Sequence, residues 1–227
     1  MKYRLIAFDF DGTLVDSFPA FLYCLNQAAE KHGFKKISDE DLKICRSISA
    51  IQLMRRLGIP IWKVPAITRD MRKAVLHQTD RIQPFEGITE LVQNLHGRGV
   101  SLAIVSSNTH ECAKAVLGNQ CLGLFEHRLF GASLLGKRYK LKELLRNSKT
   151  PSRLALYVGD ELRDADAARS LGMDFCAVAW GYTLPEAFRN QYRLMPATTL
   201  RELRAICLGE AAVKLRAPVV PPALPSS

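Results

Sequence analysis

The chain alternates between short, nearly continuous apolar runs and longer stretches in which apolar residues recur every three or four positions. A run that is apolar at almost every position predicts a strand buried on both faces, and the helical periodicity between the runs predicts crossover helices. We therefore predict an α/β fold, a doubly wound, Rossmann-like parallel sheet covered by helices. The predicted strands lie at residues 3–8, 100–105, 154–158 and 175–179.

Residues 17–83 follow a different pattern, because no strand-like run interrupts their helical periodicity. Gly33 and Gly58 stand where a glycine commonly ends a helix, since glycine adopts the left-handed conformation without strain. The periodicity predicts three helices, at residues 18–32, 39–57 and 66–82.

This helical segment divides the chain into parts. We predict that residues 17–83 form an all-helical cap, inserted into a core made of residues 1–16 and 84–210. A cap inserted after the first strand would lie over the carboxyl edge of the sheet, where open α/β folds commonly bind ligands. Residues 211–227 are rich in alanine, valine and proline, which predicts a tail without a fixed fold.

Composition excludes several classes of protein. The chain has 227 residues, 48% of them hydrophobic, so it can form a core without disulfides or a structural metal. Its six cysteines include no C-x-x-C pair, which argues against zinc-ribbon and thioredoxin-type sites. The first apolar run is too short for a signal or a membrane span, and we predict a cytoplasmic location. The net charge of +10 permits nucleic acid, acidic membranes or small anions as partners, so the choice depends on motifs.

Two carboxylates leave the first predicted strand together. Asp9 and Asp11 begin the run D-F-D-G-T-L-V-D, where the chain turns toward the predicted cap. Turn chemistry explains Asp11 followed by Gly12, but it does not explain a second acid that closes a buried strand. An aspartate in this position can attack phosphorus to form an aspartyl-phosphate, while a neighbouring carboxyl serves as general acid and base.

The run resembles the first motif of the haloacid dehalogenase-like hydrolase superfamily, whose phosphatase branch reads D-x-D-G-T-[LV]. This resemblance implies that Asp9 is the nucleophile and that Asp11 protonates the leaving alcohol, activates water and contacts Mg²⁺ through its backbone carbonyl. The dehalogenases that name the superfamily lack the second aspartate, so the pair favours phosphoryl transfer. The resemblance extends from Met1 to about Leu208, with a helical cap of the C1 type in the family's usual place.

Three polar residues follow the next predicted strand. Ser106, Ser107 and Asn108 resemble the family's second motif, in which one hydroxyl, Ser106 here, and loop amides bind a phosphoryl oxygen. Taken alone, these residues are more typical of a loop or a helix N-cap, with Asn108 or Thr109 accepting from free amides. Their position at a strand end favours phosphate binding.

Asp160 and Asp164 follow a third strand and match the family's fourth motif, G-D-x-x-x-D. If the helix begins at Asp160, the two carboxylates share one helix face. The alternative interpretation is that they are favourable negative charges at a helix N-terminus. Together with Asp9 and Asp11 they predict an oxygen-only site, which suits Mg²⁺.

A lysine completes the predicted site by offsetting the charge of the nucleophile and binding phosphate. Lys137, four residues before Leu141, best fits the family's third motif, K-x-x-x-[LI], and Lys140 is the alternative. Many family members have Lys-Pro here, and this chain does not. A solvated helix face would also explain most of the basic residues around Lys137.

The motifs together predict a Mg²⁺-dependent phosphatase that hydrolyses a small phosphorylated metabolite through an aspartyl-phosphate, with neither nucleic acid nor membrane as partner. The segment 180–183, W-G-Y-T, resembles phosphoglycolate phosphatase-like members of the family, although an aromatic turn packed on the core would also explain it. The sequence carries no signal for an oligomeric state.

Three alternative functions use the same residues. A sugar-phosphate mutase would share the nucleophile, but Phe21 stands where such mutases of the superfamily carry a histidine. Phosphonate hydrolysis would need a cap lysine in a context that this chain does not show. An inactive module that binds phosphate or nucleic acid would not need intact Asp9, Asp11 and Asp160, and the basic residues do not interleave with aromatic ones.

Overall fold

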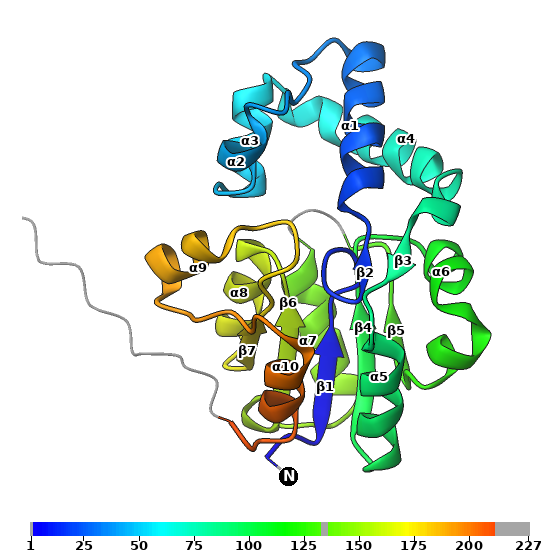
Figure 1. Ribbon diagram of the computed structural model, residues 1–227, viewed down its shortest axis with the longest axis vertical. Helices are drawn as coiled ribbons and strands as arrows, with labels where there is room; N and C mark the ends of the chain where they lie inside the picture. The colour runs from blue at the N-terminus through cyan, green and yellow to red at the C-terminus, as the bar shows by residue number, and fades with distance from the viewer. Residues whose placement is uncertain (1, 133–135, 212–227) are drawn as a thin grey trace, which may run out of the picture.

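The computed structural model describes residues 2–132 and 136–211. Within them the core is a five-stranded sheet with the order β5-β4-β1-β6-β7, and every neighbouring pair of its strands is parallel (Figure 1). The predicted fold class is therefore confirmed. The strands are β1 (Leu5–Phe8), β4 (Ser101–Val105), β5 (His127–Leu129), β6 (Ala155–Gly159) and β7 (Asp174–Ala177).

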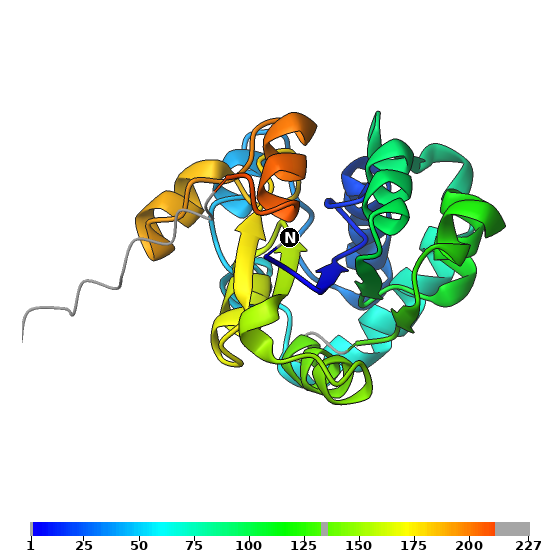
Figure 2. The same cartoon turned by 90° about the horizontal axis from the view of Figure 1, so that it is seen from below.

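The strands are apolar at successive positions because each face of the sheet is covered by helices. In β1, Ile6 and Phe8 pack into one hydrophobic cluster, while Leu5 and Ala7 pack into a second one on the opposite face. Figure 2 shows helices on both sides of the strands. The first cluster includes residues of α5 (Ile88–Gly97), α6 (His110–Gly123) and α10 (Leu200–Cys207), and the second includes residues of α7 (Lys137–Asn147), α8 (Leu162–Arg169) and α9 (Pro185–Tyr192).

Further helices stand above the carboxyl edge of the sheet (Figure 1). They are reached through an antiparallel pair of very short strands, β2 (Val15–Asp16) and β3 (Gln83–Pro84). We propose that residues 17–83 act as one cap unit on this two-strand hinge. The cap contains α1 (Phe18–His32), α2 (Leu42–Cys45), α3 (Ala50–Leu57), η1 (Ile61–Lys63), α4 (Val64–Leu76) and η2 (Thr79–Arg81).

The cap helices differ in part from their prediction. The first has the predicted bounds, and Gly33 ends it in the left-handed conformation. The stretch 39–57, predicted as one helix, is α2 and α3, because Ser49 starts a new helix through a reciprocal capping box with Gln52. The stretch 66–82 is α4 followed by the short η2.

Two further features bear on the predictions. The predicted tail at 211–227 lies, from residue 212 onward, outside the described residues. Among the residues that the structure describes, no helix has the length and apolar character needed to cross a bilayer.

Candidate active site

Asp9 stands directly after the central strand β1, in the middle of the sheet edge that faces the cap. Its backbone N–H donates to the Val158 carbonyl at 2.8 Å, which extends the pairing of β1 with β6 by one residue. Its carboxylate is buried and accepts from the Phe10 N–H at 2.8 Å. The chain then turns through Gly12, whose φ of +71° suits glycine. The nucleophile candidate is thus held by backbone contacts on a rigid strand.

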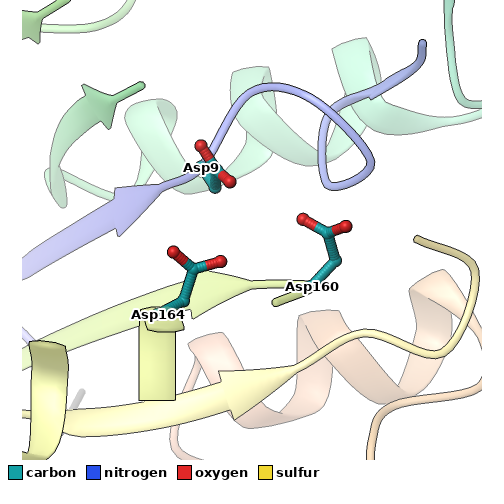
Figure 3. Close-up of side chains that lie close together, drawn as sticks. All are labelled: Asp9, Asp160 and Asp164. Carbon is teal, nitrogen blue, oxygen red and sulfur yellow. The ribbon is translucent and has the colours of Figure 1, made fainter. Parts of the chain in front are cut away.

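Three buried carboxylates meet at this edge. Asp9, Asp160 and Asp164 each offer an oxygen, and these oxygens all lie within 4.8 Å of one another (Figure 3). They come from the ends of two adjacent strands and from the first turn of a helix. An oxygen-only donor set fits the preference of Mg²⁺, so the residues present suit the predicted ion.

Asp160 lies in the loop after β6 and not in a helix, because α8 begins only at Leu162. The prediction that Asp160 and Asp164 share one helix face is therefore wrong. Instead, Asp160 is held by its neighbours: the Thr13 hydroxyl donates to one carboxylate oxygen at 2.9 Å, and the Tyr182 N–H donates to the other at 2.7 Å. Asp160 owes its orientation to loops from two distant parts of the chain.

Asp164 occupies the first turn of α8 and has most of its acceptor positions engaged. One carboxylate oxygen accepts from Lys137 Nζ at 2.5 Å and from the Tyr157 hydroxyl at 3.3 Å. The other accepts from the Glu161 N–H at 3.1 Å, within a capping box. These contacts suit a residue that orients the lysine.

Lys137, the first residue of α7, is buried and bridges Asp9 and Asp164. Lys140 lies one turn later, with its side chain 34% exposed, and pairs with Glu143 at 3.4 Å. The structure therefore brings Lys137, and not Lys140, to the carboxylate cluster.

Burial and mutual repulsion set the electrostatics of the cluster. Burial raises the pKa of Asp9 to about 7, although Lys137 opposes the shift. Burial also raises the pKa of Asp160, and the charge of Asp9 adds to the increase. Burial alone would lower the pKa of Lys137, but Asp164 and Asp9 raise it, so the lysine stays charged. A bound divalent cation would favour the ionised form of these carboxylates, whose pKa values are raised.

Asp11 faces the cap and does not join the three-carboxylate cluster. Its carboxylate accepts from Asn108 Nδ2 at 3.1 Å and lines a cavity beneath the cap. Burial raises the pKa of Asp11, while hydrogen bonds from Ser17 and Asn108 oppose the shift. A carboxyl that lines the cavity and has a raised pKa suits proton transfer to a leaving group.

The residues after β4 lie beside Asp11. The buried Ser106 hydroxyl accepts from the Asn108 N–H at 2.9 Å, and Ser107 lines the cavity. Thr109 is the N-cap of α6, where its hydroxyl accepts from the Cys112 N–H. Asn108 donates from Nδ2 to Asp11, and its Oδ1 accepts from the Thr109 N–H at 2.8 Å.

A cavity of about 260 Å³ lies between cap and core. Phe18 and Phe21 contribute to its apolar part, and Arg46 and Arg72 bring cationic side chains from the cap. From the core, Arg163 also lines it and forms an ion pair with Glu161. Arg163 was not predicted from the sequence. It lies at an unspecified position of the G-D-x-x-x-D motif, and its positive charge was the one feature that could have marked it as a site residue.

Comparison with known proteins finds related chains over most of the length. Residues 6–178 match the family described as haloacid dehalogenase-like hydrolase. A phosphoglycolate phosphatase from Synechococcus elongatus is 34% identical over 180 residues, covering 79% of this chain and 85% of that protein. A phosphoglycolate phosphatase from Caulobacter vibrioides is 27% identical over 190 residues, covering 78% of this chain and 80% of that protein.

Solved structures share the fold. A predicted phosphatase from Clostridium acetobutylicum superposes with a TM-score of 0.76 at 19% identity, covering 91% of this chain and 99% of that one. CbbY from Rhodobacter sphaeroides, in complex with phosphate, gives a TM-score of 0.63 at 18% identity, covering 80% of this chain and 88% of that one. At these identities the likeness extends to the fold alone.

Proposed function

The chain belongs to the haloacid dehalogenase-like hydrolase family and is a phosphatase of that family, and we propose that it hydrolyses a small phosphate monoester through an aspartyl-phosphate on Asp9, with Mg²⁺ as cofactor. The main support is the buried cluster in which Lys137 contacts both Asp9 and Asp164, with Asp160 beside them. A nucleophilic carboxylate, a fixed cation and an oxygen-only metal site are the groups that phosphoryl transfer needs.

The first step transfers the phosphoryl group to the enzyme. An oxygen of Asp9 forms a bond to phosphorus while the bond from phosphorus to the ester oxygen breaks, and Asp11 gives its proton to the departing alkoxide. Lys137, the Ser106 hydroxyl and the Ser107 N–H bind the phosphoryl oxygens as charge develops on them.

The second step restores the enzyme. Asp11, now a carboxylate, takes a proton from water as that water attacks phosphorus, and the bond between phosphorus and Asp9 breaks to release inorganic phosphate. Asp9, Asp160 and the Asp11 carbonyl would hold the Mg²⁺, which would supply positive charge to the phosphoryl group. Asp164 orients Lys137 and borders the metal site.

The proposed substrate is a small dianionic or trianionic metabolite, with phosphoglycolate the first candidate because the relatives named above are phosphoglycolate phosphatases. A cavity of about 260 Å³, to which Arg72 brings a cationic side chain from the cap, suits a compact, negatively charged molecule. A sugar-phosphate mutase is disfavoured, because Phe21 packs against Tyr182 with ring centroids 5.1 Å apart and offers no group for proton transfer.

Removal of divalent metal is expected to abolish turnover of an aryl phosphate, because the charge of the phosphoryl group would then face buried carboxylates. Activity should return when Mg²⁺ is added in excess of the chelator. Phosphate release is measured for an aryl phosphate and for a panel of phosphorylated metabolites, ranked by kcat/KM. Full turnover in the presence of chelator would contradict the proposal, and the ranking identifies the substrate.

A further inference from the structure

The core loop 180–183 contacts the candidate metal site and the cap at the same time. On the side of the site, the Tyr182 N–H donates to Asp160 Oδ2 at 2.7 Å, and the Thr183 N–H donates to the Asp160 carbonyl at 3.3 Å. The loop approaches so closely that a Cβ on Gly181 would lie 2.1 Å from Asp160 Cβ. Only glycine fits there, so this backbone is in direct contact with the carboxylate.

From the other side, Arg46 of the cap binds the same loop. Its Nη2 donates to the Gly181 carbonyl at 2.6 Å, and its Nε donates to the Tyr182 carbonyl at 3.0 Å. The backbone is bound in return, because the Leu184 N–H donates to the Arg46 carbonyl at 2.8 Å. The guanidinium carbon also lies 4.9 Å from the centroid of the Phe18 ring, within the range of a cation–π contact.

The Gly181 carbonyl and the Tyr182 N–H belong to one peptide unit. A peptide unit is planar and rigid, and in the trans form its C=O and N–H point in opposite directions. Arg46 therefore binds one end of a rigid unit, and Asp160 accepts from its other end. A rotation of this unit that breaks the arginine contact also turns the N–H away from the carboxylate.

The arginine contact joins the cap to the core beside the start of α1, because Arg46 packs on Phe18 and the Tyr182 hydroxyl is hydrogen-bonded to Ser17. Arg46 follows α2, which together with α3 lies on the side of the cap away from the β2–β3 pair (Figure 1). Arg46 belongs to the cap and the 180–183 loop belongs to the core, so a turn of the cap on its hinge would change this contact. Opening or closing of the cap would then change the orientation of Asp160 through the peptide unit.

We propose that Arg46 is a positioning residue that couples cap closure to the orientation of Asp160, by holding the Gly181–Tyr182 peptide unit against the metal site. This inference rests on the proposed function, because it takes Asp160 as a ligand of Mg²⁺. It gives the W-G-Y-T segment a role beyond packing: Gly181 allows the close approach, and Tyr182 supplies the N–H.

The test is direct metal binding to the substrate-free protein, measured by calorimetric titration with Mg²⁺ or Mn²⁺. Arg46→Ala is expected to weaken binding about tenfold, a typical coupling between linked sites. Arg46→Lys keeps the charge but lacks the planar fork that reaches two carbonyls, so its affinity should be intermediate. Arg55→Ala, which removes an exposed arginine of α3, is the matched control and should bind as the wild type does.

Each outcome has a separate meaning. If Arg46→Ala binds metal as tightly as the wild type and only the KM for substrate rises, Arg46 contacts substrate and the inference is wrong. Wild-type affinity in Arg46→Lys would show that charge alone suffices, which also overturns it. Failure of the wild type itself to bind a divalent ion would instead refute the cofactor of the proposed function. Thermal unfolding without metal identifies a variant that has lost its fold, and Arg46→Lys then decides the question.

Discussion

Replacing Asp9 with asparagine is expected to lower kcat by about 10⁴-fold or more, since an amide oxygen does not replace a carboxylate as nucleophile toward phosphorus. The substitution keeps the size of the side chain and its contact with the Phe10 N–H. The fold should therefore persist. Phosphate release from an aryl phosphate, measured with saturating Mg²⁺, gives the loss of activity.

The control for this variant is Asp39→Asn, which makes the same chemical change at an exposed position of the cap segment. Its activity should equal that of the wild type. Thermal unfolding of both variants shows whether the fold is retained. Turnover by Asp9→Asn within tenfold of the wild type would contradict the assignment of the nucleophile.

Replacing Lys137 with alanine is expected to have the second largest effect. Removal of the lysine leaves the buried carboxylates of Asp9 and Asp164 without their cation, which typically costs about 3–5 kcal/mol of unfolding free energy. It also removes a fixed positive charge from the phosphoryl group, with an expected loss of roughly 10²–10³-fold in kcat. Urea unfolding and steady-state kinetics at neutral pH measure the two effects.

Lys140→Ala is the matched comparison, because it removes the same side chain from the same helix. The Lys140 side chain is partly exposed and forms a salt bridge with Glu143. We therefore expect its removal to change the free energy of unfolding by less than about 1 kcal/mol, with little loss of activity. A larger loss of activity in Lys140→Ala than in Lys137→Ala would reverse the assignment of the two lysines.

Much of the core follows from the sequence, because strands buried on both faces and amphipathic helices leave strong patterns. A short, partly exposed strand leaves a weak one. Strand β5, with the sequence His-Arg-Leu, was not predicted, because it is short and only partly buried at the edge of the sheet. The break between α2 and α3 has a local signal, Ser49 followed by Gln52, that the apolar periodicity on both sides obscured.

Part of the candidate site can likewise be predicted from the sequence, and part of it cannot. Aspartates at strand ends can be found from the sequence, because parallel strands bring their carboxyl ends to one edge. The contacts that orient these residues cannot be found this way, since Arg46 and Gly181 are separated by 135 positions and meet only through the fold. The choice between Lys137 and Lys140 likewise depends on the rotation of α7, which a motif of two conserved positions does not determine.

The central claim is that Asp9 carries the phosphoryl group between the two steps. A rapid acid quench during turnover of a good substrate, followed by proteolysis and mass spectrometry, locates any phosphorylated residue. We predict one additional phosphoryl group on the peptide that contains Asp9, lost on treatment with hydroxylamine and absent from Asp9→Asn. A phosphoryl group on a different residue, or an unmodified Asp9 peptide while product forms in a burst, would contradict the account.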